Sequence, residues 1–471
     1  MQKPCSSFFV VFRATETTMR NKIVEESVLF VSLLKWLVLS SVVGITAGAA
    51  TAAFLKILHA SIAFATPPSH AFFLLPAGLF LSALLVKYVA REAKGYGTEK
   101  VIESVHRHSG RIRAVVVPVK LAATVVTAAV GGSVGQVGPS AQIGGGLASV
   151  LAGFLKFDDN DRKKLVICGI SAGFSAVLGA PVSGAIFGVE VLFVGTLLYE
   201  VLLPSFVAGI IGYHTASFLG VTYFHYPIRA ISAFSDAFFL EIIVSGIFFG
   251  ICAIVVIETV HGADRLFAKV RIWQPLQAIL GGVVLALLAS VFSAKYLGLG
   301  LNTIQEALQG VRMVSYDFLM KTVFTAITFA SGGSGGIIAP ILFVGATAGS
   351  FFGDLLSLDR ATFASIGMVS VLAAAANTPV AMSMLAIELF GGEIGAYAAV
   401  ACVISFLISG HRSIFPTQVM AMKKSSSVDV ELGREVENVK TRFKYREKSF
   451  IGQGIRLRDK IRRRIQNGGG E

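Results

Sequence analysis

Long apolar runs recur along the chain and alternate with short polar or glycine-rich segments. Examples are residues 28–58, 72–86, 114–130, 242–257 and 276–291. The runs are continuous and rich in Ala, Leu and Gly, whereas membrane strands alternate with a period of two residues. Many are long enough for a helix to cross a hydrocarbon core of ~30 Å, and others are shorter and interrupted by Gly or Pro. The pattern predicts an all-α integral membrane protein with about ten or more helices.

Composition and charge support a membrane protein and add an orientation. Hydrophobic residues make up 54% of the 471 residues and charged residues only 15%, and the mean hydropathy is +0.73. The formal charge of +13 is concentrated near the C-terminus, where residues 423–471 hold 14 Lys/Arg against 7 Asp/Glu. By the positive-inside rule this basic tail is cytoplasmic, which is a commoner reason for such a tail than nucleic-acid binding. We therefore expect a multi-pass protein of the cell (inner) membrane that binds no nucleic acid.

The two ends of the chain give few further signals. Residues 1–27 contain one apolar patch that is too short for a cleavable signal peptide, so we interpret them as a cytoplasmic N-terminal segment. In the tail, Leu457, Ile461 and Ile465 lie four residues apart among arginines. This spacing fits either a short basic helix on anionic lipid or a solvated charged tail. The four cysteines and eight histidines lack metal-ligand spacing, so we expect no metal, no cofactor and no enzymatic activity.

Two glycine-rich stretches share a skeleton and predict an internal duplication. "GGSVGQVGPSAQIGGG" begins at Gly131 and "GGSGGIIAPILFVGA" at Gly332. In both, a Gly, a Pro and a further Gly recur in the same spacing at an offset of 201 residues (135 to 336). A second match places a Glu nine residues after a Pro in each half: Pro181 with Glu190, and Pro379 with Glu388. The repeats are predicted at 28–220 and 237–420.

Gly and Pro within apolar runs predict helices that end or begin inside the membrane. Such a helix start has backbone N–H groups without partners and a partial positive charge, which suits an anion. Irregular backbone is tolerated at that depth only where protein encloses a cavity, and matching breaks in duplicated halves indicate a solute site. The alternative is that small residues allow close helix packing. The two stretches in register favour a site.

Four motifs, in order, resemble those of the CLC chloride channels and chloride/proton antiporters. "GYGTEKVIESV" from Gly95 is similar to the family's GSGIP segment, "GQVGPSAQIGG" from Gly135 to GREGP and its continuation, "GGIIAP" from Gly335 to GGIFAP, and "GHRSIFPTQV" from Gly410 to the last motif. The resemblance covers nearly the whole membrane region. It implies two inverted-topology repeats with broken helices, a homodimer in membrane lipid with one anion path per subunit, and two cytoplasmic termini. The tail is too short for the paired CBS domains of some members.

The resemblance also assigns residues to the anion path. Backbone amides of the two broken helices and a few hydroxyls would hold the anion weakly enough to release it. Lys120 matches a family lysine, with either an electrostatic role or a side chain that reaches the membrane interface. The predicted path residues are Tyr96, Gly135, Gln136, Val137, Gly138, Gly336, Ile337, Ile338, Ala339 and Phe415.

The sequence departs from the family at its titratable and hydroxyl positions. Val137 stands where antiporters carry the gating glutamate, and Val191 where many carry the internal proton glutamate. Glu190 replaces the latter only if the register slips by one residue; otherwise it has a structural role, as a cap or in a pair inside the bundle. Tyr96 replaces a common Ser and Phe415 a common Tyr, so Tyr96 either supplies the lost hydroxyl or plugs the inner mouth.

These departures favour a passive, proton-uncoupled channel for chloride or a similar anion, because no titratable side chain remains where a proton would be exchanged. One alternative is a chloride/proton antiporter with another relay such as Glu190, and another is a non-conducting relative with a scaffold role. "GGSG" at Gly332 also matches the pattern around a membrane serine nucleophile. A catalytic Ser334 would need a histidine on a later helix, and the later histidine, His411, lies at a segment end, which argues against a protease.

Overall fold

The computed structural model describes residues 7–65, 71–223, 226, 236–425, 428–439 and 442–443, and this part forms sixteen α-helices. The first eight are α1 (Ser7–Ala65), α2 (Leu75–Tyr88), α3 (Thr98–Arg107), α4 (Val116–Ala129), α5 (Val137–Phe154), α6 (Asp159–Leu178), α7 (Pro181–Glu190) and α8 (Tyr199–Phe218). The second eight are α9 (Asp236–Lys269), α10 (Gln274–Val291), α11 (Leu301–Leu308), α12 (Asp317–Ala330), α13 (Ile338–Leu355), α14 (Arg360–Ala376), α15 (Pro379–Phe390) and α16 (Gly392–Ile408).

The remaining elements are short. Four 3-10 turns are η1 (Ala71–Leu74), η2 (Arg91–Ala93), η3 (Ala294–Tyr296) and η4 (Val436–Asn438). Four two-residue strands are β1 (Phe193–Val194), β2 (Val419–Met420), β3 (Val428–Asp429) and β4 (Arg442–Phe443). The predicted basic helix around Leu457 lies outside the described residues.

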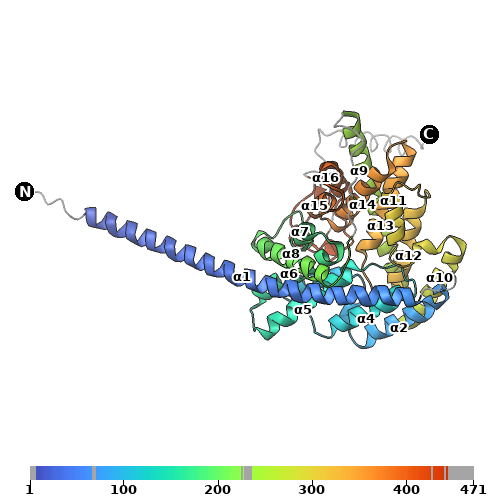
Figure 1. Ribbon diagram of the computed structural model, residues 1–471, viewed down its shortest axis with the longest axis horizontal. Helices are drawn as coiled ribbons and strands as arrows, with labels where there is room; N and C mark the ends of the chain where they lie inside the picture. The colour runs from blue at the N-terminus through green and yellow to red at the C-terminus, as the bar shows by residue number, and fades with distance from the viewer. Residues whose placement is uncertain are drawn as a thin grey trace, which may run out of the picture.

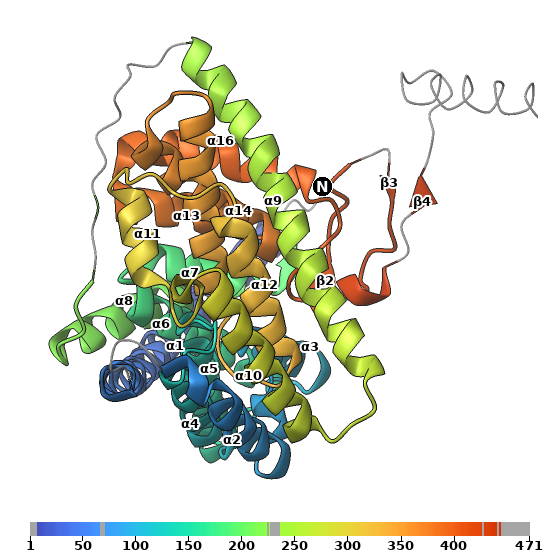
Figure 2. The ribbon, with the colours of Figure 1, turned by 90° about the vertical axis from the view of Figure 1, so that its right-hand side faces the viewer.

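The helices repeat in length and order, and the two sets gather on different sides of the molecule (Figures 1 and 2). α5 and α13 both have 18 residues, and α4 and α12 both have 14. The starts of α6 and α14 are also equivalent, because Asp158 accepts a hydrogen bond from the amide of Asp161 and Asp359 one from the amide of Thr362. These aspartates lie 201 residues apart and act as N-caps. The described structure therefore has the internal repetition that the motif spacing predicts.

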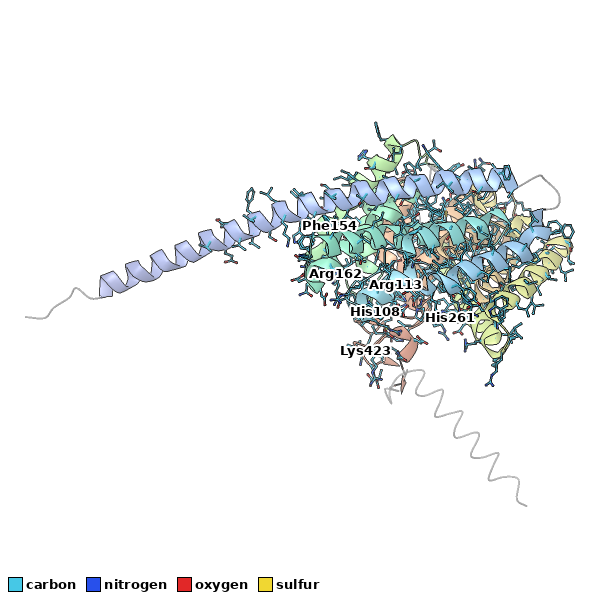
Figure 3. All side chains as sticks on the ribbon, turned by 90° about the horizontal axis from the view of Figure 1, so that it is seen from below. His108, Arg113, Phe154, Arg162, His261 and Lys423 are labelled. Atoms are coloured by element: carbon cyan, nitrogen blue, oxygen red, sulfur yellow. The ribbon has the colours of Figure 1, made fainter. Side chains whose placement is uncertain are left out.

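Several of the helices are long and apolar enough to cross a membrane. In the described part of the chain there are five: α1 from Val24 onward, α8, α9, α10 and α13. α1 runs unbroken through the predicted boundary between residues 1–27 and the first repeat at 28–220, and its N-terminal part extends beyond the other helices (Figures 1 and 3). The location of residues 1–27 in the cytoplasm stays a prediction.

Some of the glycines in the two motif stretches serve helix packing. A Cβ on Gly144 of α5 would lie 2.2 Å from the carbonyl oxygen of Gly169 in α6, and a Cβ on Gly345 of α13 would lie 2.3 Å from that of Gly367 in α14. The contact is the same in both repeats. Close packing is thus the reason for glycine at these positions. The glycines four residues before each proline, Gly135 and Gly336, have a different role.

The segment after α16 folds back onto the helical body. β2 pairs in parallel with β1, and the Arg107 guanidinium at the end of α3 forms hydrogen bonds of 2.7 and 2.5 Å with the two carboxylate oxygens of Glu435. This arginine holds the pKa of Glu435 below its usual range by hydrogen bonding and charge. The first part of the basic tail is therefore attached to the transmembrane body.

Candidate anion-binding site

The two predicted helix breaks meet each other at the centre of the protein. The amide of Gly135 donates to the carbonyl oxygen of Gly336 at 2.6 Å, and the amide of Gly336 donates to that of Gly135 at 2.8 Å. These glycines are equivalent in the two repeats, so the reciprocal pair marks the pseudo-two-fold relation between them. α5 and α13 begin immediately afterwards, and their N-termini therefore lie side by side.

Both helix starts present free backbone donors. The N-cap residues Gln136 and Ile337 have helical backbone angles and make no side-chain capping bond. The first-turn amides have no intrahelical partner, and the third position of each helix is a proline without an N–H. The remaining donors are the amides of Val137, Gly138, Ile338 and Ala339. Two partial positive charges of about half an elementary charge each coincide here, which favours an anion.

Glycine is required where the loop before α3 approaches these helix ends. A Cβ on Gly138 would lie 2.2 Å from the carbonyl oxygen of Tyr96, and a Cβ on Gly97 would lie 2.5 Å from the carbonyl oxygen of Gly138. Gly97 also has a φ of +75°, which side-chain-bearing residues rarely adopt. The structure thus brings Tyr96, Gly135, Gly138 and Gly336, four of the predicted path residues, together.

A cavity of about 150 Å³ leads to the helix ends from one direction. Val137 and Ala339 line it, with apolar side chains from α1, α6, α11, α13, α14 and α15. Its polar lining includes Gln136 and His59, whose Oε1 and Nε2 atoms are 3.3 Å apart. No sequence pattern pointed to His59, because it lies on α1, 77 residues before Gln136 and outside every motif.

Tyr96 and Phe415 lie outside the cavity lining. The Tyr96 hydroxyl donates a hydrogen bond to Oδ2 of Asp264 at 2.9 Å, so its hydrogen is already engaged. Phe415 is fully buried, and the amide of Thr417, two residues later, donates to Glu99 Oε1 at 3.2 Å. This bond joins the loop of Phe415 to the start of α3. Neither Asp264 nor Glu99 was predicted: Asp264 lies outside every motif, and Glu99 lies within the motif from Gly95 but had no role assigned to it.

Lys120 is fully buried and binds backbone. Its Nζ donates to the carbonyl oxygens of Gly95 at 2.6 Å and Ala93 at 3.2 Å, and to Ser334 Oγ at 3.1 Å. The side chain therefore fixes the loop that carries Tyr96 and does not reach the membrane interface. Lys321, 201 residues later and also fully buried, binds the carbonyl oxygens of Tyr296 at 3.0 Å and Gly298 at 2.9 Å.

Glu190 and Glu388 cap each other's repeat. The carboxylate oxygens of Glu190 accept from the amides of Val380 and Ala381 at 3.0 and 2.7 Å, in the first turn of α15. Those of Glu388 accept from the amides of Val182 and Ser183, both at 2.8 Å, in the first turn of α7.

Val191 follows Glu190 directly and has no exposed surface. Its carbonyl oxygen accepts from Gln418 Nε2 at 2.7 Å. Both carboxylate oxygens of Glu190 are engaged, and this capping contact is the one that its structural interpretation predicts.

Ser334 and His411 have separate partners. Ser334 Oγ donates to the carbonyl oxygen of Ala93 at 3.0 Å and accepts from Lys120, whereas His411 Nε2 accepts from the amide of Lys424 at 3.4 Å. This geometry gives no support to a serine protease.

The fold and these helix ends define a class: an α-helical membrane protein of two repeats, whose broken helices start beside each other with backbone donors that suit an anion. Residues 78–410 match the family model described as voltage gated chloride channel. A chloride/fluoride channel protein of Pseudomonas syringae pv. tomato is 33% identical over 399 residues, which is 83% of this chain and 88% of that protein. The ClC-type chloride channel ClcB of Shigella flexneri is 27% identical over 304 residues, 62% of this chain and 72% of that protein.

Solved structures with the same fold lead to the same family. A CLC-type fluoride/proton antiporter superposes with a TM-score of 0.78 at 27% identity, covering 82% of this chain and 98% of that chain. A slow cyanobacterial chloride/proton antiporter superposes with a TM-score of 0.68 at 21% identity, covering 79% and 94%, and shows the shared fold. The chain belongs to the CLC family of anion-transporting membrane proteins, as its motifs predict.

Proposed function

We propose that this protein is a passive, proton-uncoupled channel for chloride and fluoride. The observation that carries the proposal is Val137, which begins α5, lines the cavity and adjoins the free amides of the helix ends. An antiporter needs a group at this point that exchanges a proton for the anion, and a valine side chain has none. The anion therefore meets no competing carboxylate at this position.

The other half of a proton route is also without a free acid. Val191 is apolar and buried, and both carboxylate oxygens of Glu190 are held by the amides of α15. Releasing Glu190 for proton transfer would leave the amides of Val380 and Ala381 without acceptors, and that of Ala381 is buried, which is costly. These contacts support passive conduction over the antiporter alternative that uses Glu190.

Two observations lead us to propose fluoride as a second permeant anion: the names of similar proteins, and the replacement of the family's usual Ser and Tyr by Tyr96 and Phe415. One relative is named for chloride and fluoride, and one superposed structure is a fluoride/proton antiporter. With Phe415 unable to donate and the Tyr96 hydroxyl engaged, the anion depends on backbone amides, which can donate hydrogen bonds to chloride or to fluoride. The proposal includes a homodimer in the cell (inner) membrane with cytoplasmic termini, and no enzymatic activity.

A second candidate is a fluoride/proton antiporter that uses His59. The imidazole lines the cavity, lies 3.3 Å from Gln136 and can carry a proton. In this candidate the proton relay is His59, which lies beside the helix ends, and not Glu190.

The test is anion efflux from liposomes that contain the purified protein, with external pH recorded and the membrane potential clamped by an ionophore. A channel gives rapid chloride and fluoride efflux without proton movement, and His59→Gln leaves proton movement at zero. Uphill proton movement driven by an anion gradient contradicts the channel, and its loss in His59→Gln identifies the imidazole as the relay.

A further inference from the structure

Tyr96 connects the anion site with the surface of the protein. Its carbonyl oxygen packs against Gly138 at the start of α5, and its hydroxyl reaches Asp264, an exposed residue five positions before the end of α9. The tyrosine itself is only 8% exposed, so its ring fills the space between the helix ends and that surface. Figure 3 shows His261, three residues before Asp264, on the side of the molecule that also carries His108 and Lys423.

The ring is held on two sides. Its centroid is 4.8 Å from that of Phe329 in α12, with an interplanar angle of 88°, which is the favoured edge-to-face arrangement. The hydroxyl donates to the carboxylate at 2.9 Å, and hydrogen bonds to charged groups are stronger than neutral ones. Tyr96 is therefore fixed in one orientation, away from the cavity that opens at Val137.

A carboxylate beside the end of an anion path opposes anion entry unless it has another task. Lys94 and His261 lie near enough to act on the charge of Asp264. The hydrogen bond to Tyr96 connects Asp264 to the site. Asp264 lies on α9, and none of the predicted path residues belongs to that helix.

We propose that Asp264 is a positioning residue that latches Tyr96 across the path, so that anions pass when the phenol leaves the carboxylate. The proposal rests on the proposed channel function. Of the two interpretations of Tyr96, a hydroxyl donor or a plug of the inner mouth, it selects the plug. The Tyr96–Asp264 hydrogen bond then limits flux in place of the missing gate glutamate.

The experiment measures chloride efflux per reconstituted protein for Tyr96→Phe, Asp264→Ala and the double variant, under the clamp described above. If the latch limits flux, each single variant raises it by about 10- to 100-fold, the effect of losing one hydrogen bond to a charged group. The double variant is then no faster than either single one, because both remove the same bond. Asp264→Asn keeps an acceptor oxygen and stays slower than Asp264→Ala.

Simple charge repulsion gives a different pattern. It predicts that Asp264→Asn is as fast as Asp264→Ala and that the effects of Tyr96→Phe and Asp264→Ala multiply. Glu258→Gln is the matched control, because it removes an acid from the same part of α9 that is paired with Arg412 and not with Tyr96. Multiplying effects, an equal rise in Glu258→Gln, or unchanged flux in both single variants would overturn the latch. Absence of anion flux in the unmodified protein would instead overturn the proposed function.

Discussion

Glu190→Gln separates a structural carboxylate from a proton relay, and the chain supplies its own control in Glu388→Gln. Each glutamate accepts two backbone hydrogen bonds from the first turn of the short helix in the other repeat. Family resemblance places a proton glutamate near residue 190 in the first repeat and none at the equivalent place in the second. A structural role therefore predicts the same behaviour for both variants, and a relay predicts a difference.

The expected loss of stability follows from the geometry. Glutamine keeps one acceptor oxygen and turns an NH₂ group toward the second amide, which leaves that N–H without an acceptor. Losing a charge-assisted bond costs about 1.5–3 kcal/mol, and an unsatisfied buried donor costs about 1–3 kcal/mol. We expect Glu190→Gln to lower the free energy of unfolding by about 2–4 kcal/mol. The loss for Glu388→Gln is smaller, because Glu388 is only partly buried whereas Glu190 is 5% exposed.

The assay combines unfolding in mixed micelles of increasing SDS content with the liposome measurement. Both variants unfold at lower SDS than the unmodified protein, and chloride flux per folded protein stays the same in both. The reasoning is refuted if Glu190→Gln alone changes proton movement or its pH dependence, or if neither variant is destabilised.

Three further changes follow from single contacts. Val137→Glu is expected to lower chloride flux and make it pH-sensitive, and equal flux at every pH would contradict the assignment of this position. Gly138→Ala places a Cβ 2.2 Å from a backbone carbonyl oxygen and is expected to abolish flux or folding, whereas Gly153→Ala on the same helix meets nothing within 4 Å and stays active. Arg107 lowers the pKa of Glu435, so their contribution to stability is complete above the ordinary glutamate pKa and is lost as the pH falls through the lowered one. Limited proteolysis of the C-terminal segment should therefore quicken at acid pH, and Arg107→Gln should be equally sensitive at neutral pH.

The scaffold of the site could be predicted because its residues recur in both halves of the sequence. The offset of 201 residues pairs Gly135 with Gly336, and these two residues hydrogen-bond to each other in the structure. The same comparison places a glutamate nine residues after a proline in each half. Lys321 follows Lys120 at the offset of 201 residues and also lies inside an apolar run, so the second buried lysine could have been predicted in the same way.

The groups around the site could not be predicted from spacing. Asp264 lies 168 residues from Tyr96, and His59 lies 77 residues from Gln136. Which side chain each of them meets depends on the angle at which its helix packs. Motif and period carry no information about that angle, so these contacts appear only with the fold.

The pseudo-two-fold relation distinguishes groups that build the protein from groups that give the path its direction. The reciprocal glutamate caps, the buried lysines that bind carbonyl oxygens and the paired glycines all occur in both repeats, which is expected of a scaffold inherited by duplication. Lys120 belongs to this set, because its charge is taken up by the loop before α3. The Tyr96–Asp264 bond breaks the relation, since the residue equivalent to Tyr96 at the 201-residue offset is Leu297, which has no hydroxyl. Any difference between the two ends of the path has to come from such unpaired contacts. A group that acts on one end of the path only is therefore expected among these contacts and not among the duplicated glutamates.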